Sequence, residues 1–356
     1  MSQTAPTAEA DQSASRFFDF KAAVARTTQD FPETQKGTIF LRTDTPHETY
    51  GHWKAKLRAA LHGHGLIGQK KIQQSLADDT SYAFQPQWPS PLQTLVFKPD
   101  DLMTQTLTAT VPAHQAQSFV FFHELGHLTV ENASGGWQSG KPFPENAADS
   151  FATIKHLQEN KEDILLPLVN SWARAYRFVV TSNATHLTST STEALVALRD
   201  TPELSGLRGK TLSRFAADHA HQHSPDQENI DEALYIFGPY RGMDKLYPFT
   251  EGTAHKLAQL AETALATENK FAFQIGLSLF RPFLHPAGAE VNGQHIQLPE
   301  GQRADFVKRF EEKSAQFGVQ SLITEWCENV DAVCARAGHN QTAPAQTQKP
   351  LALKLS

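Results

Sequence analysis

The segment AQSFVFFHELGHLTVE (residues 116–131) constrains the fold of this chain more than any other stretch. Its pattern predicts a helix, and the residues around its HELGH pentad are uncharged, which indicates a helix buried at a cleft. His123 and His127 are four residues apart, so they share one face of that helix, one turn apart. Such a face either binds a metal ion or belongs to a core helix whose histidines find hydrogen-bond partners.

The pentad has the residue types that a catalytic zinc site needs. Two imidazole nitrogens at this spacing can reach one tetrahedral ion at about 2.0–2.1 Å. Glu124 lies next to the first histidine and can hold a water molecule without binding the metal itself. A catalytic site also needs a third protein ligand and an open fourth position. A third histidine six residues after His127 is absent, because position 133 is alanine.

An acidic residue on a following helix is the other source of a third ligand. The segment KPFPENAADSFATIKHL (residues 141–157) predicts such a helix, with Glu145 and Asp149 on one face. Ala148 and Ala152 have small side chains, so this helix can approach the pentad helix closely. We predict that Glu145 is the third ligand and that Asp149 accepts the second ring N–H of a ligand histidine. The alternative is a helix N-terminus that carries acids to suit its dipole.

These residues resemble the zincin metallopeptidases whose third zinc ligand is a glutamate. The pentad followed by ENAADSFA is particularly similar to the ImmA/IrrE-like peptidases and related bacterial metallopeptidases, over residues 116–155. The resemblance implies one Zn²⁺ per chain, held by His123, His127 and Glu145, with Glu124 as the general base. It also implies a zincin-like fold and a peptide or protein substrate. The Gly-rich stretch between the two motifs departs from compact members of that group.

Hydrolysis of a peptide also needs a group that stabilises the oxyanion, usually a His, Tyr or Arg from later in the chain. The segment NATHLTSTSTEAL places His186 just before a predicted helix. The segment ALYIFGPYRGMDKLYPF places Tyr240 at a turn marked by Gly and Pro. Both residues are candidates, and the alternative for each is ordinary packing within the helical part of the chain.

The fold class predicted from the pattern is α+β, with a small mixed sheet before the active-site helix and a mostly helical C-terminal lobe. The 356 residues, 40% of them hydrophobic and 20% charged, are typical of a globular chain. Helical patterns predominate after the pentad. Before it, strands are predicted at 37–44, 92–102 and 107–112, and helices at 16–27 and 47–65.

The predicted domain organisation is one metallopeptidase-like domain, residues 16–338, with two lobes. Its N-terminal α/β lobe extends to about residue 165, and the helical lobe covers 166–338. Residues 1–15 and 339–356 are polar and lack apolar periodicity, which predicts flexible tails.

Composition excludes several classes of function. The net charge of -6 offers no basic surface for nucleic acid or for an anionic membrane. The strongly apolar runs are too short to span a bilayer. The N-terminus has neither the basic nor the apolar region of a secretory signal, and Cys327 and Cys334 imply no disulfide framework. These features favour a cytoplasmic location, while export without a cleaved signal stays open.

The leading hypothesis is therefore a zinc-dependent peptidase in which Glu124 acts as the general base. A rival from another class is a non-catalytic zincin-like module, in which a structural zinc joins two helices and the rest binds a partner protein. A fourth protein ligand, such as His156 or His186, would favour that rival. A third reading is an exported effector whose peptidase acts in another cell.

Overall fold

The computed structural model describes most of the chain from Phe18 onward. The described residues are 18–32, 34, 38–43, 58, 62, 69–70, 72–74, 77, 81–84, 93–100, 103, 107, 111–134, 143–242, 252–291, 294–339 and 351–353. Within these ranges, no helix combines the length and the apolar character needed to cross a membrane.

The N-terminal part of the chain contains a small mixed sheet. Its strands lie in the order β1 (Thr38–Arg42), β3 (Gln93–Phe97) and β2 (Tyr82–Phe84). β1 is parallel to β3, and β2 is antiparallel to it. All five residues of β3 are buried, as expected for a central strand that is covered on both faces. All three strands precede the pentad. β1 and β3 fall within the predicted strands 37–44 and 92–102, whereas the sequence analysis does not predict β2.

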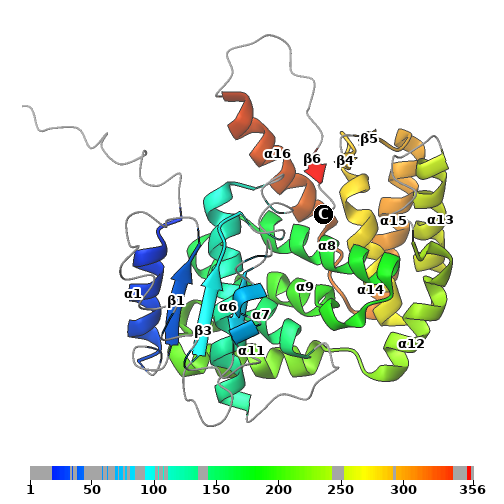
Figure 1. Cartoon of the computed structure of the whole chain (residues 1–356). Coiled ribbons are helices and arrows are strands. Elements are labelled where there is room, and N and C mark those ends of the chain that lie inside the picture. The colour runs from blue at the N-terminus through cyan, green and yellow to red at the C-terminus, as the bar shows by residue number, and fades with distance from the viewer. Residues whose placement is uncertain are drawn as a thin grey trace, which may run out of the picture.

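Aromatic side chains join this sheet to its neighbouring helices. Helix α1 (Phe20–Asp30) lies beside β1 in Figure 1. Phe97 of β3 stacks on Phe20, with ring centroids 5.6 Å apart, and meets Phe121 edge-on at 6.0 Å. Phe121 belongs to helix α6 (Ala113–Ser134), which carries the pentad. These contacts hold α6 against the sheet.

Helix α6 packs closely against helix α7 (Phe143–Glu159), which carries the predicted third ligand. Gly126, inside the pentad, lies at the point of closest approach. A Cβ atom added there would lie 2.9 Å from the backbone Cα of Ala148 and 3.1 Å from Cβ of Phe151. Ala148 and Ala152 are fully buried, which agrees with the prediction that small side chains let α7 approach α6 closely.

Gly126→Ala is therefore expected to destabilise the protein. The new methyl group has to push the backbone of α7 away, and overpacking of this kind costs about 1–3 kcal/mol. Urea unfolding followed by circular dichroism would measure the change in the free energy of unfolding. Gly301→Ala in helix α15 (Glu300–Phe317) is the matched control, because nothing lies within 4 Å of a Cβ at that position. A Gly126→Ala protein as stable as the control would contradict the close-packing argument.

The rest of the described chain is mostly helical, as Figure 1 shows. The further helices are α8 (Leu165–Thr181), η1 (Ala184–His186), α9 (Ser189–Ala197), α10 (Pro202–Gly206), α11 (Gly209–His223), α12 (Gln227–Ile236), η2 (Gly238–Tyr240), α13 (Gly252–Ala266), α14 (Lys270–Phe280), η4 (Arg281–Leu284) and α16 (Ile323–His339). Helix α7 packs against α9 and α11, and α8 packs against α9 and α14. One continuous cluster of buried hydrophobic residues runs from Phe18 to Val330.

A second small sheet lies in the C-terminal part of the chain, where the sequence predicts helices and a flexible tail. Its strands, in order, are β5 (Gln294–Ile296), β4 (Ala289–Val291) and β6 (Leu351–Leu353). β6 belongs to the segment 339–356, so the prediction of a flexible tail is wrong for these three residues. The backbone of β6 pairs in parallel with β4, and this pairing gives the tail a partner that composition alone does not indicate.

Two further sequence predictions have different outcomes. The strand predicted at 107–112 is wrong at Leu107 and Val111, because the backbone N–H of Val111 donates to the carbonyl of Leu107 as in a helical turn. The helix predicted at 47–65 lies outside the described residues, apart from Arg58 and His62, which are helical.

Candidate metal centre

The three predicted ligands converge at the contact between α6 and α7. Nε2 of His123 lies 3.2 Å from Nε2 of His127. Oε2 of Glu145 lies 3.5 Å from Nε2 of His123, and Oε1 of the same carboxylate lies 3.5 Å from Nε2 of His127. Among the described residues, these three are the ones whose ligand atoms all lie within 4.8 Å of one another.

The spacing of the two nitrogens and the Glu145 carboxylate is close to that around a tetrahedral zinc ion. Bonds of about 2.0–2.1 Å place the ligand atoms of a tetrahedral ion about 3.3–3.4 Å apart. The observed separations of 3.2, 3.5 and 3.5 Å lie close to that value. Two imidazoles and one carboxylate are also a donor set that Zn²⁺ prefers. The residues present therefore fit one zinc ion.

Asp149 lies behind the first histidine, one turn after Glu145 on α7. One of its carboxylate oxygens is 2.6 Å from Nδ1 of His123. Once His123 is neutral, Nδ1–H donates to this carboxylate and the lone pair of Nε2 points toward the other two ligands. Asp149 thus has the position that the sequence predicts for it. Its side chain is fully buried, and the Thr188 hydroxyl donates to its second oxygen at 2.6 Å.

Arg174, on α8, contacts the candidate site, and the sequence analysis missed it. Its guanidinium donates to both oxygens of Asp149, at 3.0 and 3.2 Å, and lies 3.7 Å from Glu145. This bidentate pairing fixes the Asp149 carboxylate whose oxygen contacts Nδ1 of His123. One signal could have found it, since α8 is an apolar helix and a cation on its buried side needs a carboxylate partner.

The structure places His186 beside the third ligand. Nδ1 of His186 lies 3.1 Å from Glu145 and 3.2 Å from the Arg174 guanidinium. The residue ends η1, the short turn between α8 and α9. The predicted role of His186 in stabilising an oxyanion stays a prediction. Its ligand atoms do not join the three-residue group described above. His186 therefore lies where it can hold Glu145 in place.

Tyr240 has a different environment. Its hydroxyl lies 3.0 Å from the Thr263 hydroxyl, and its ring packs against Phe237. These described contacts belong to the packing of η2 against α12 and α13, and they do not include the metal ligands.

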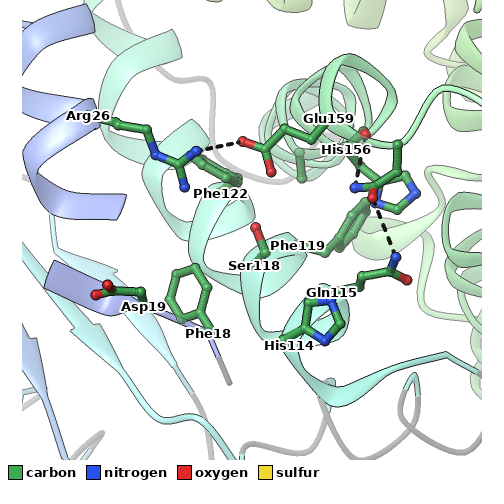
Figure 2. Close-up of a pocket in the computed structure, with 12 residues that line it drawn as sticks. Phe18, Asp19, Arg26, His114, Gln115, Ser118, Phe119, Phe122, His156 and Glu159 are labelled. Carbon is green, nitrogen blue, oxygen red and sulfur yellow. Dashed lines mark hydrogen bonds and ion pairs between the residues drawn. The ribbon is translucent and has the colours of Figure 1, made fainter. Parts of the chain in front are cut away.

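His156 lies away from the ligands as well. Its Nε2 donates to the backbone carbonyl of Asp163 at 2.7 Å. It lines a cavity of about 200 Å³ that Figure 2 shows, between the start of α6, the end of α7 and α1. The walls combine phenylalanine rings with polar groups, and Arg26 pairs with Glu159 across the rim. The three metal ligands are not among the residues that line this cavity.

Two further residues lie near the ligands. Glu124 is buried on α6 between the two histidines. Its charge acts on His123, on Arg174 and on Tyr82. Tyr82 comes from the sheet strand β2, and burial together with the charges of Glu124 and Glu145 raises the pKa of its phenol.

The two histidines differ in their affinity for protons. Burial lowers the pKa of His123, but Asp149 and the two nearby glutamates outweigh burial and raise it to about 9. Burial lowers the pKa of His127 to about 4, and the proximity of His123 contributes to that shift. Burial would raise the pKa of Asp149, but Arg174 and His123 outweigh it and hold the carboxyl far below its usual range. At neutral pH, His123 therefore carries a proton that a metal ion has to displace.

Zinc binding is accordingly expected to depend on pH. Below the His123 pKa of about 9, the deprotonated fraction falls tenfold per pH unit, so the affinity for zinc should fall about tenfold for each unit from pH 8 to pH 6. Competition with a chromophoric chelator, corrected for the protonation of the chelator itself, would measure this slope. An affinity that stays constant over these two units would contradict the assignment of a protonated His123.

The chain was compared with known proteins in three ways. No family model matches it, no curated protein matches it, and no solved structure matches it. The arguments for its function therefore rest on the residues and geometry of this site.

Proposed function

We propose that this protein is a zinc-dependent peptidase. The observation that carries the proposal is the convergence of His123, His127 and Glu145, whose ring nitrogens lie 3.2 Å apart and each 3.5 Å from an oxygen of the carboxylate. The neighbouring Glu124 and the Asp149 behind His123 add the two supporting groups that hydrolysis requires. The order of small sheet, pentad helix and glutamate helix also supports a zincin-like fold.

The chemistry divides between the ion and the chain. Bound zinc would polarise the scissile carbonyl and lower the pKa of a water molecule. Glu124 accepts a proton from the attacking water and then delivers it to the amine nitrogen that leaves, so one carboxylate acts as base and then as acid. Asp149 and Arg174 hold His123 in the orientation and tautomer that present Nε2 to the ion. His186 holds the Glu145 carboxylate.

The rival function is a protein-binding module with a structural zinc. Structural zinc sites have four protein ligands, whereas catalytic sites keep one position open. Among the described residues, a fourth ligand atom does not join the three. His156, one of the two residues considered as a fourth ligand, donates a hydrogen bond to the Asp163 carbonyl instead. This difference favours the peptidase.

The zinc content of the protein tests the proposal. Protein purified without chelator and washed free of loosely held metal should contain about one zinc per chain. It should also hydrolyse fluorescein-labelled casein, stop when the zinc is removed with 1,10-phenanthroline, and recover when zinc is added back. His127→Ala should contain far less zinc, and His295→Ala, at an exposed histidine on β5, should match the unchanged protein. A folded chain without tightly bound zinc would overturn the proposal.

A further inference from the structure

The cavity of about 200 Å³ in Figure 2 is a chemical feature that the proposed reaction does not use. It lies where the start of α6 meets the end of α7, and α1 forms its third wall. Gln115 and Asn160, which both line it, are joined by a hydrogen bond of 3.4 Å. An apolar cavity of about 150 Å³ holds one benzene molecule, so this space has room for an aromatic ring system with a polar group.

The inner walls of the cavity suit a flat apolar ligand. Phe18, Phe119 and Phe122 contribute phenyl rings that are almost completely buried, and Ala152 of α7 contributes a methyl group. In the view of Figure 2, Phe18 and Phe122 lie on one side of the cavity and Phe119 lies toward the other. Aromatic rings that meet edge to face or in an offset stack attract one another beyond the effect of burial alone. These walls therefore favour an aromatic ligand.

Two buried hydrogen-bond acceptors lie in the same walls. Nε2 of His156 donates to the Asp163 carbonyl at 2.7 Å, so Nδ1 keeps the lone pair of the neutral ring. Burial lowers the pKa of His156, which keeps the ring neutral at pH 7. Gln115 donates through Nε2, and its buried Oε1 has no hydrogen-bond partner among the described residues. Because an unpaired buried acceptor costs free energy, the cavity favours a ligand that supplies an N–H or O–H group.

The entrance of the cavity is charged. Arg26 and Glu159 form an ion pair of 3.4 Å there, with side chains that are 58% and 35% exposed. An exposed pair between two long side chains contributes little free energy, so it opens easily to admit a ligand. Asp19, which is also exposed, adds a second carboxylate. Two carboxylates against one guanidinium disfavour a ligand that carries a negative charge.

We propose that this cavity binds a small uncharged aromatic molecule that carries an N–H or O–H donor. The ring system lies among the three phenylalanines, and its donor meets Oε1 of Gln115. A charged group is disfavoured because the phenyl rings and the neutral His156 offer it no opposite charge. The three metal ligands do not line the cavity, so this site is independent of the proposed peptidase function.

Indole and N-methylindole test the proposed hydrogen bond. Both have the same fused ring, but the methylated compound has no N–H to donate. Calorimetry on the full chain should show saturable binding of indole, one molecule per chain, with or without zinc. N-methylindole should bind about tenfold more weakly, because it leaves the Gln115 acceptor unpaired.

Gln115→Leu replaces the acceptor by an apolar side chain of similar size. The two compounds should then bind with affinities within about twofold of each other. Gln117→Leu is the matched control on α6, since Gln117 does not line the cavity, and it should keep the tenfold preference for indole. The midpoint of urea unfolding checks that both variants are folded.

A third variant tests the location. Ser118 lines the cavity and is only half-buried, so Ser118→Phe should fold, fill the space and abolish binding of both compounds. Indole binding that survives Ser118→Phe would place the ligand elsewhere and overturn the proposal. So would equal affinities of the unchanged protein for the two compounds, or no saturable binding of either, which would mean that the cavity holds only water. A zinc-free chain that does not hydrolyse casein but binds indole as described would overturn the peptidase proposal alone.

Discussion

Glu124→Gln is expected to retain its zinc and to lower kcat by on the order of 10²–10⁴-fold. Glutamine has nearly the same shape as glutamate but cannot accept the proton of the attacking water. Glu124 is not one of the three residues whose ligand atoms converge, so its replacement should leave the donor set intact. Steady-state hydrolysis of labelled casein, together with elemental analysis of the same samples, measures both effects.

Two other Glu→Gln changes separate chemistry from metal binding. Glu145→Gln removes a ligand carboxylate, so it should lose zinc as well as activity. Glu203→Gln, at an exposed position on α10, should change neither. Full turnover by Glu124→Gln would exclude the general-base mechanism, and loss of zinc in that variant would mean that Glu124 belongs to the metal site itself.

The local geometry of the site could be predicted from the sequence because helical spacing determines it. Residues four apart share a helix face, so the pairs His123–His127 and Glu145–Asp149 each define a surface. The small residues Ala148 and Ala152 indicate which faces can meet. The structure brings these faces together, with Gly126 at the closest approach.

Contacts between distant segments could not be predicted in the same way. Arg174 reaches Asp149 from α8, and nothing in the local pattern specifies that partner. Tyr82 lies on a strand of only three residues, which is too short for an alternating pattern to be recognised. β6 depends on pairing with β4, more than fifty residues earlier in the chain. Such contacts are determined by tertiary packing, and a single sequence carries little information about them.

Asp149→Asn is expected to affect both stability and metal binding. Arg174, with a side chain 11% exposed, would lose its bidentate partner and keep only the 3.7 Å pair with Glu145, and breaking a buried ion pair costs about 3–5 kcal/mol. His123 would also lose the group that fixes its tautomer, so the affinity for zinc should fall about 10–100-fold. Urea unfolding of the zinc-free protein measures the free energy of unfolding, and chelator competition measures the affinity.

The protein has a matched control for this substitution. Glu193, 6% exposed on α9, binds the buried Arg281 guanidinium through two hydrogen bonds of 2.9 and 2.8 Å. Glu193→Gln breaks the same kind of ion pair without touching a metal ligand, so it should cost similar stability and leave the affinity for zinc unchanged. If both variants weaken zinc binding equally, general destabilisation explains the loss and the orienting role of Asp149 fails. If only Asp149→Asn weakens it, the contact between Asp149 and His123 contributes to the metal site directly.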